Sequence, residues 1–174
     1  SIIKSLLGEN AFKRYHKGSS KDPNGNWEKR RFNTALYDVL MDTFARYDKN
    51  LIYANLDAIR EAYINLMTSN DDFIDAIELG TSVEKSINKR FEIFRSTIAQ
   101  IVGNKSKETR LFSKNFKMQL FKENPTCALC GNTILSVDDA AVDHIEQYWL
   151  GGKTIPENAR LTHRYCNTAR PRKE

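Results

Sequence analysis

Apolar residues recur at helical spacing through the N-terminal half of the chain. In segment 27–47 they fall on every fourth position with polar residues between them, and the stripe consists of Phe32, Leu36, Leu40 and Phe44, with Met41 alongside. Segment 51–68 continues with similar spacing. This pattern is typical of amphipathic helices that bury one face. We therefore predict one helix in each segment.

Turn and capping residues divide the helical pattern that follows. Two acids open a short helix predicted over 71–79, and Gly80 ends it. The segment 81–84, Thr-Ser-Val-Glu, has the spacing of a capping box and begins the next helix, which reaches Gly103. Residues 27–102 are therefore predicted to form a four-helix body with enough apolar surface to bury a core.

The pattern changes character after this helical body. One more helix is predicted over 112–121, because apolar residues again lie on one face and Pro125 follows it. Beyond it, β-leaning runs at 133–137 and 140–145 alternate with glycine turns. The chain is therefore predicted to be mainly α, with a domain change near 110–125. We divide it into a leader at 1–26, a helical platform at 27–110 and a C-terminal domain at 111–174.

The composition is that of a folded protein with one or two compact units. The 174 residues are 40% hydrophobic and 28% charged, which is typical of globular domains. No apolar run is long enough for a membrane span or for the core of a secretory signal. The cysteines number three, so they cannot all pair as disulfides. We therefore expect no membrane association, a cytoplasmic location and a reducing environment.

Positive charge is concentrated on both sides of segment 126–162. The net charge of the chain is +5. Residues 103–125 carry six Lys or Arg against two acids, and residues 163–174 carry four against one. Basic segments placed in this way can hold an anionic polymer against a site between them. The alternative is a solvated lysine-rich surface, which is the interpretation that we prefer for the similarly basic residues 1–31.

Two short pairs of cysteine and histidine residues give the strongest chemical signal. Cys127 and Cys130 have the spacing of a turn whose sulfurs converge on a metal, and His163 and Cys166 repeat that spacing downstream. The set provides three thiolates and one imidazole, which suits tetrahedral zinc, and it uses every cysteine of the chain. The alternative is a redox dithiol with an unrelated core cysteine, but the βαβ context of such dithiols is missing. We predict a structural zinc site at these four residues.

The residues between and after the two pairs carry a family resemblance. The ordered motifs are Cys127-x-x-Cys130, Asp143-His144-Ile145, Gly151-Gly152, Glu157-Asn158 and His163-Arg-Tyr-Cys166-Asn167. Together they resemble the HNH endonucleases of the ββα-metal type. The resemblance covers roughly the last fifty residues and implies a small zinc-stapled ββα-metal domain that hydrolyses DNA phosphodiester bonds. The predicted fold is therefore a helical bundle, indicated by the apolar spacing, followed by this domain. One departure is His163, which stands where many zinc-bearing members have a cysteine, although imidazole also binds zinc well.

The resemblance also implies roles for four residues of a catalytic centre. Asp143 and Asn167 would hold a divalent ion, for which oxygen ligands favour Mg²⁺ or Mn²⁺. His144 would be the general base that takes a proton from water. Because Asp143 and His144 are neighbours on a predicted strand, the pair requires a local bend at the strand end. Asn158 would fix the following loop or orient His144. Each residue alone also fits an ordinary structural role, and their order between the zinc pairs favours the catalytic one.

Basic residues around this centre are expected to contact phosphate groups of double-stranded DNA rather than to read bases. They are Lys153, Arg160, Arg164, Arg170, Arg172 and Lys173, with an extension over Lys114, Lys117 and Lys122. Tyr148 and Trp149 either stack on a base or form the lid of a small core. An aromatic pair beside a glycine turn favours the lid.

A broader resemblance concerns the helical part. Its texture, for example in DDFIDAIELG, is similar to the C-terminal portion of bacterial anti-phage restriction proteins that join a ParB-like nucleotide-hydrolysing domain to an HNH nuclease. That resemblance implies a role in restriction or phage defence, with a nucleotide-hydrolysing domain and a second copy of the chain as expected partners. The competing hypothesis is a non-enzymatic zinc knuckle that binds nucleic acid or protein. Asp143, His144 and Asn167 favour the enzyme, because a binding knuckle needs no base and no oxygen ligands.

Overall fold

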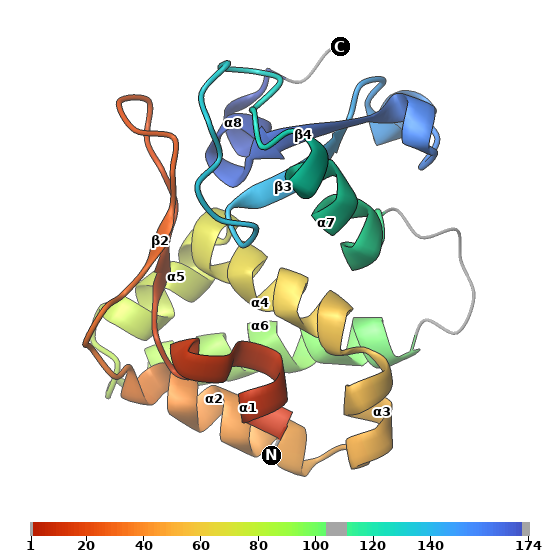
Figure 1. Cartoon of the computed structure of the whole chain (residues 1–174). Helices are drawn as coiled ribbons and strands as arrows, with labels where there is room; N and C mark the ends of the chain where they lie inside the picture. The colour runs from red at the N-terminus through yellow and green to blue at the C-terminus, as the bar shows by residue number, and fades with distance from the viewer. Residues whose placement is uncertain (1, 104–110, 172–174) are drawn as a thin grey trace. The chain divides into compact units, whose positions relative to one another are not determined.

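The computed structural model describes residues 2–103 and 111–171, which belong to two compact units (Figure 1). The helical unit consists of Ser1–His16 and Trp27–Ser106, and the C-terminal unit consists of Lys17–Asn26 and Lys107–Glu174. The predicted leader is therefore not a separate segment. Its first part belongs to the helical unit, and its second part belongs to the C-terminal unit.

The helical unit packs short and medium helices around one core. Its elements are α1 (Ile2–Leu7), the 3-10 turn η1 (Gly8–Asn10), β1 (Tyr15–His16), α2 (Thr34–Ala45), α3 (Lys49–Ala54), α4 (Leu56–Ser69), α5 (Asp71–Glu78) and α6 (Glu84–Gly103). A two-residue strand, β2 (Asn26–Trp27), pairs with β1. The core includes Leu36, Leu40 and Phe44 of the first predicted stripe, whereas Phe32 and Met41 are exposed. It also takes in Leu6, Leu7 and Tyr15. The N-terminal helix is thus an integral part of this core.

Two helices of this unit differ from the prediction. The helix expected from residue 27 begins only at Thr34, because the Asn33 side chain caps it by accepting a hydrogen bond from a backbone N–H of the first turn. The helix expected over 51–68 is two helices, α3 and α4, which meet at Asn55, where φ of −120° and ψ of 15° depart from helical values. The other two predicted helices are confirmed as α5 and α6.

In the C-terminal unit, one helix precedes a pair of strands and a second helix follows them. Its elements are α7 (Lys114–Glu123), β3 (Ala140–His144), the 3-10 turns η2 (Tyr148–Leu150) and η3 (Pro156–Asn158), β4 (Ala159–His163) and α8 (Arg164–Ala169). Strands β3 and β4 are antiparallel, with Ala140 opposite His163 and His144 opposite Ala159. Both α7 and α8 pack against the two strands. The fold is thus mainly α with a small ββα domain near the C-terminus.

A second, smaller core holds the C-terminal unit together. Its buried members are Cys127, Ile134, Ala140 and Leu161, with Leu120, Phe121, Val142 and Cys166 packed against them. Of the two β-leaning runs, only the second forms a strand, whereas Thr133 makes an isolated bridge with Thr126. The helix expected from residue 112 begins at Lys114, after the capping residue Ser113. Among the described residues, none of the helices has both the length and the apolar character of a membrane span.

Candidate active site and metal centre

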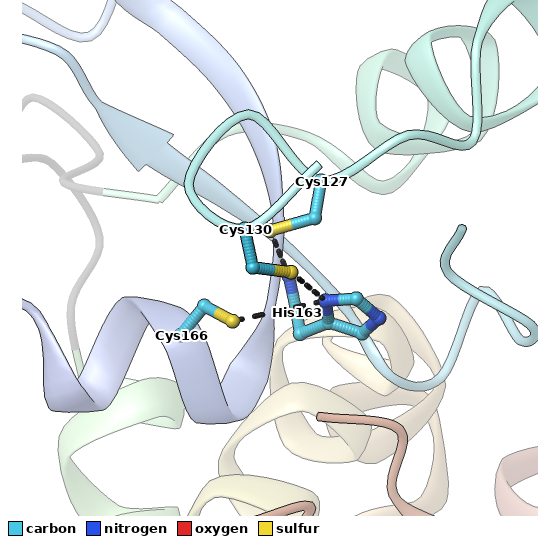
Figure 2. Close-up of side chains that lie close together, drawn as sticks. All are labelled: Cys127, Cys130, His163 and Cys166. Carbon is cyan, nitrogen blue, oxygen red and sulfur yellow. Dashed lines mark hydrogen bonds between the residues drawn. The ribbon is translucent and has the colours of Figure 1, made fainter. Parts of the chain in front are cut away.

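Three cysteines and one histidine come together from three separate elements. Cys127 and Cys130 lie in the turn after α7, His163 ends β4, and Cys166 lies on α8. Their sulfur and nitrogen ligand atoms all lie within 4.8 Å of one another (Figure 2). The turn closes through a hydrogen bond of 2.9 Å from the Gly131 N–H to the Cys127 carbonyl, with Gly131 at a φ of +75° that glycine adopts without strain. The two predicted ligand pairs therefore meet in space.

The spacing of these atoms fits a tetrahedral zinc ion. With Zn–N of about 2.0 Å and Zn–S of about 2.3 Å, a nitrogen and a sulfur ligand lie roughly 3.6 Å apart. The Nδ1 atom of His163 lies 3.5 Å from the Cys130 sulfur and 3.8 Å from the Cys166 sulfur. The backbone N–H of His163 donates to the Cys127 sulfur at 3.4 Å. A zinc ion held here would join the turn, the second strand and the last helix.

The surroundings of Cys127 favour its thiolate form. Burial raises the pKa of this thiol, but hydrogen bonds from the backbone amides of Cys130, His163 and Leu129 outweigh burial and bring the pKa to about 6. At Cys166, burial and then the neighbouring sulfurs of Cys130 and Cys127 raise the pKa to about 12. Crowded thiolates repel one another, and a divalent cation among them relieves that repulsion. Donor type, spacing and charge therefore all fit zinc.

The two histidines of this domain lie in different surroundings. His163 is fully buried, with Nδ1 toward the sulfurs and with Nε2 lacking a hydrogen-bond partner among the described residues. His144 is half-buried at the end of β3, where its Nε2 lies 3.0 Å from the Thr154 hydroxyl. The rings of Phe112 and Tyr148 lie 4.7 and 5.6 Å from the imidazole, measured between centroids. His144 is thus outside the zinc set and is oriented by its own neighbours.

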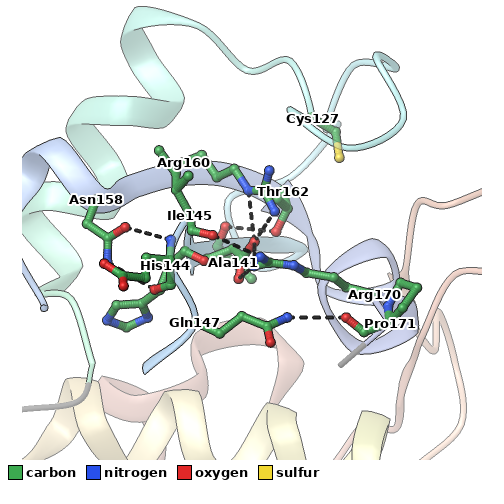
Figure 3. A network of polar contacts seen from close by, with 12 residues as sticks. Cys127, Ala141, His144, Ile145, Gln147, Asn158, Arg160, Thr162, Arg170 and Pro171 are labelled. Atoms are coloured by element: carbon green, nitrogen blue, oxygen red, sulfur yellow. Dashed lines mark hydrogen bonds and ion pairs between the residues drawn. The ribbon is translucent and has the colours of Figure 1, made fainter. Parts of the chain in front are cut away.

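Asp143 is buried. Its carboxylate binds two arginines, Arg160 and Arg170, whose side chains are labelled in Figure 3. Arg160, its partner across the strand pair, donates Nε to the carboxylate at 2.9 Å, and Arg170 donates Nη1 to both carboxylate oxygens at 2.7 and 2.9 Å. Arg170 also donates to the backbone carbonyls of His144 at 2.7 Å and Ile145 at 2.9 Å. The chain after α8 is thereby tied to the end of β3. The side chains of Asp143 and His144 have different partners, as the alternation of a strand dictates.

Asn158 closes the loop between the two strands. Its Oδ1 accepts a hydrogen bond from the Glu146 backbone N–H at 2.7 Å, and its Nδ2 donates to the carbonyls of Glu146 and Lys153 at 3.1 and 2.9 Å. Gly152 comes so close that a Cβ atom there would collide with the Glu146 carbonyl oxygen. Of the two roles expected for Asn158, these contacts support fixation of the loop.

Asp143 and Asn167 offer the oxygen atoms that a hard divalent ion prefers. Asn167 is half-buried on α8, next to the zinc-set residue Cys166, and α8 packs against β3. The donor chemistry fits Mg²⁺ or Mn²⁺. The charge of the Asp143 carboxylate is nevertheless already compensated by two guanidinium groups. An ion bound there would be repelled by both arginines, which lowers its affinity.

Three of the arginines expected on DNA make contacts within the protein. Arg164 is buried and donates Nε to the Asp138 carbonyl, so its predicted phosphate contact does not fit its burial. Arg160 and Arg170 bind the Asp143 carboxylate. These side chains stabilise the strand pair and the start of α8, because each joins segments distant in the sequence.

The remaining basic residues differ in how exposed their side chains are. Lys153 is exposed in the loop between the strands. On α7, Lys117 is buried, whereas the other two predicted lysines are exposed. Arg172 and Lys173 lie outside the described residues.

Sequence reasoning missed several residues that hold the end of β3. Gln147 is buried and donates Nε2 to the Pro171 carbonyl at 3.2 Å, and Thr154 contacts His144. Phe112, expected on the inward face of a helix, precedes that helix and packs on the imidazole. Gln147 and Thr154 belong to no motif or regular spacing, and the regular spacing of Phe112 predicted a helical position rather than a contact with His144.

Comparison with known families gives one match. A family model described as HNH endonuclease matches residues 127–173, a stretch that includes the zinc set, both strands and α8. No curated protein and no solved structure matches the chain. The family match and the group of three cysteines and one histidine fit an HNH zinc knuckle. The C-terminal part is therefore similar to metal-dependent nucleases.

Proposed function

We propose that the C-terminal unit is a metal-dependent endonuclease that hydrolyses DNA phosphodiester bonds, with His144 as the general base. The proposal rests chiefly on the separation of the two histidines, since His163 faces three sulfurs whereas His144 stands at the end of β3. An imidazole committed to a metal is a poor base for water, whereas one outside the metal set can take a proton. The HNH endonuclease match over 127–173 supports the same class of reaction.

In this reaction His144 removes a proton from the water molecule that attacks phosphorus. A bond forms between the water oxygen and phosphorus, the bond to the 3′ oxygen breaks, and the leaving oxygen takes a proton from solvent. Thr154 and the rings of Phe112 and Tyr148 hold the imidazole in one orientation. A base that is already oriented loses less entropy on reaching the transition state.

The other residues of the centre keep the strand end and its loop in place. Asn158 binds the backbone of the loop, and Arg170 binds the carbonyls of His144 and Ile145. A divalent ion held by the oxygens of Asp143 and Asn167 would stabilise the negative charge that develops on the phosphate. Lys153 is exposed in this loop, and we assign it to phosphate contact.

A second candidate function is a non-enzymatic zinc knuckle that binds nucleic acid. It is favoured by the burial of Asp143 between Arg160 and Arg170, because a carboxylate used as a structural brace needs no divalent ion. The two candidates differ in what they require of His144. Only the nuclease needs its imidazole for activity.

The experiment is a plasmid-nicking assay with Mg²⁺ or Mn²⁺. His144→Ala should reduce the nicking rate by roughly 10²–10⁴, the usual contribution of a positioned base, while zinc content and DNA binding stay unchanged. His16→Ala is the matched control, because His16 pairs with Glu28 in the helical unit. Equal rates for wild type and His144→Ala would favour the zinc knuckle.

At the level of the whole protein we propose a part in restriction of foreign DNA. Double-stranded DNA would be the substrate, in the cytoplasm, with a nucleotide-hydrolysing domain and a second copy of the chain as partners. The support is the resemblance of the helical unit to anti-phage restriction proteins. Loss of phage resistance in cells that carry His144→Ala, with His16→Ala still protective, is the expected result. Equal protection by both variants would contradict it.

A further inference from the structure

The loop between β3 and β4 carries a cluster of exposed apolar side chains. They are Ile145, Tyr148, Trp149, Leu150 and Ile155, and each is more than a third exposed, up to 53% at Trp149. Keeping large apolar groups in water is unfavourable, and clusters of them on a surface mark binding sites. We call these five residues the loop cluster.

The loop cluster is not the lid of the small core. That core is covered by Leu120 and Phe121 of α7 and by Val142 and Cys166. The lid that the sequence favoured for Tyr148 and Trp149 is therefore supplied by other residues. The exposed aromatic side chains need another explanation.

The loop presents these side chains from a fixed backbone. Asn158 binds Glu146 and Lys153, and the N–H groups of Leu150 and Gly152 donate to the Gln147 carbonyl at 2.8 and 3.2 Å. Side chains carried on an ordered backbone lose little further entropy when they bind. The structure therefore resembles a preformed contact surface rather than a loose loop.

The position and the aromatic character of these side chains indicate what this surface contacts. The Tyr148 ring lies 5.6 Å from the His144 ring, so the loop cluster adjoins the proposed base. The loop between β3 and β4 carries Lys153 together with two exposed acids, Glu146 and Glu157, so its net charge does not attract a polyanion. Its aromatic side chains are what suit nucleic acid, because their flat faces can stack on bases. A protein bound to this loop would instead block the access of a substrate to His144.

We propose that Trp149, with Leu150 beside it, inserts between two stacked base pairs next to the phosphate that His144 attacks. This inference rests on the proposed function and defines its substrate class as duplex DNA that can be unstacked at the cut. Apolar side chains that enter a duplex in this way kink it and pay the cost of unstacking. Stacking of the indole on a base offsets that cost. Steps that unstack easily, such as pyrimidine–purine steps, should therefore be cut preferentially.

The first test measures unstacking without cleavage. The full chain carrying His144→Ala is bound to a short duplex that contains a fluorescent adenine analogue, whose emission rises when the base unstacks. We expect emission to rise on binding, to stay flat with the added change Trp149→Ala, and to recover with Trp149→Phe. Leu135→Ala is the control, because Leu135 is 75% exposed and lies outside the loop. Flat emission with both the His144→Ala chain and its Leu135→Ala derivative would overturn the proposal.

The second test measures cleavage of two duplexes that differ only in a central mismatch. Trp149→Ala should slow cleavage of the intact duplex roughly ten- to hundredfold, the usual contribution of one stacked aromatic side chain. The mismatched duplex should restore most of the rate, because its bases are already unstacked. An equal loss on both duplexes, or no loss on either, would overturn the proposal.

Failure of this inference and failure of the proposed function have different signatures. If wild type nicks DNA in a His144-dependent manner but Trp149→Ala acts like wild type, only the insertion is wrong. If no variant cleaves DNA, the proposed function fails, and the fluorescence experiment still decides whether Trp149 enters the duplex. Melting temperature and zinc content of Trp149→Ala should match wild type. A lowered melting temperature with equal cleavage losses on both duplexes would assign Trp149 a structural role and overturn the proposal.

Discussion

Arg170 is predicted to be the main tie between the end of the chain and the end of β3. Its guanidinium contacts the Asp143 carboxylate and the carbonyls of His144 and Ile145. The side chains of Arg170 and Asp143 are only 11% and 9% exposed. Screening by water is therefore weak, and Arg170→Ala should destabilise the C-terminal unit.

The size of this destabilisation depends on which partners the Asp143 carboxylate keeps after Arg170 is replaced. Removing one partner of a buried ion pair costs about 3–5 kcal/mol when the other charge is left alone. Here Arg160 stays on the same carboxylate, with its Nη2 2.8 Å from Asp143 Oδ2. The free energy of unfolding should therefore fall by about 2–3 kcal/mol. Arg170→Lys should lose less, because it keeps the charge but not the fork of donors.

Urea unfolding of the zinc-loaded chain measures this loss. Trp27 and Trp149 are the two tryptophans of the chain, one in each unit, so a Trp27→Phe background lets fluorescence report the C-terminal unit alone. Free zinc must be buffered, because its binding is coupled to folding. Exposed Lys122, changed to Ala, controls for loss of one positive charge. A loss below about 0.5 kcal/mol for Arg170→Ala would refute the role of this residue.

Three further predictions concern the zinc set and the helical unit. Cys166→Ser should abolish stoichiometric zinc in elemental analysis and unfold the C-terminal unit, because structural zinc contributes on the order of 10 kcal/mol to folding; a folded, zinc-free variant would contradict this. The hydrogen bond from Arg46 is the main cause that lowers the Asp42 pKa to about 2. Burial raises this pKa in part, and Arg95 lowers it further. Because the unfolded state then binds more protons, stability should fall as pH drops from 3.8 towards 2, and Asp42→Asn should show no such fall; identical pH profiles would disprove it. Asn33→Ala should cost about 1 kcal/mol in thermal unfolding followed by circular dichroism, because it removes the cap of α2, and Asn33→Asp should retain most of that cap; equal costs for both would assign the effect to the Asn33 amide instead.

The zinc set was predictable because the chemistry of the ion dictates both residue type and spacing. A tetrahedral site needs four soft or borderline ligands, and paired ligands in short turns leave a trace in the sequence. The family pattern also placed His144 outside that set. Helix positions could be predicted where apolar spacing was regular, as in α5 and α6, which have the bounds Asp71–Glu78 and Glu84–Gly103.

What could not be predicted depends on contacts between distant segments. Arg170 was expected on phosphate, because a basic residue near a nuclease motif gives no sign of its folded partner. In the structure it binds Asp143, a residue 27 positions away in the sequence. The break at Asn55 interrupts a regular apolar pattern without proline or glycine. Exposure of Trp149 was equally hidden, since an aromatic residue beside a glycine turn suits either a lid or a binding surface.

The roles of the two histidines are separated by comparing their alanine variants. Nicking rate and zinc content are measured together for His144→Ala and His163→Ala. We expect His144→Ala to keep one zinc ion per chain and to lose roughly 10²–10⁴ in rate, and His163→Ala to lose zinc and the fold of the C-terminal unit. A His163→Ala variant that retains zinc but cannot cleave DNA, beside a nearly active His144→Ala, would contradict these roles.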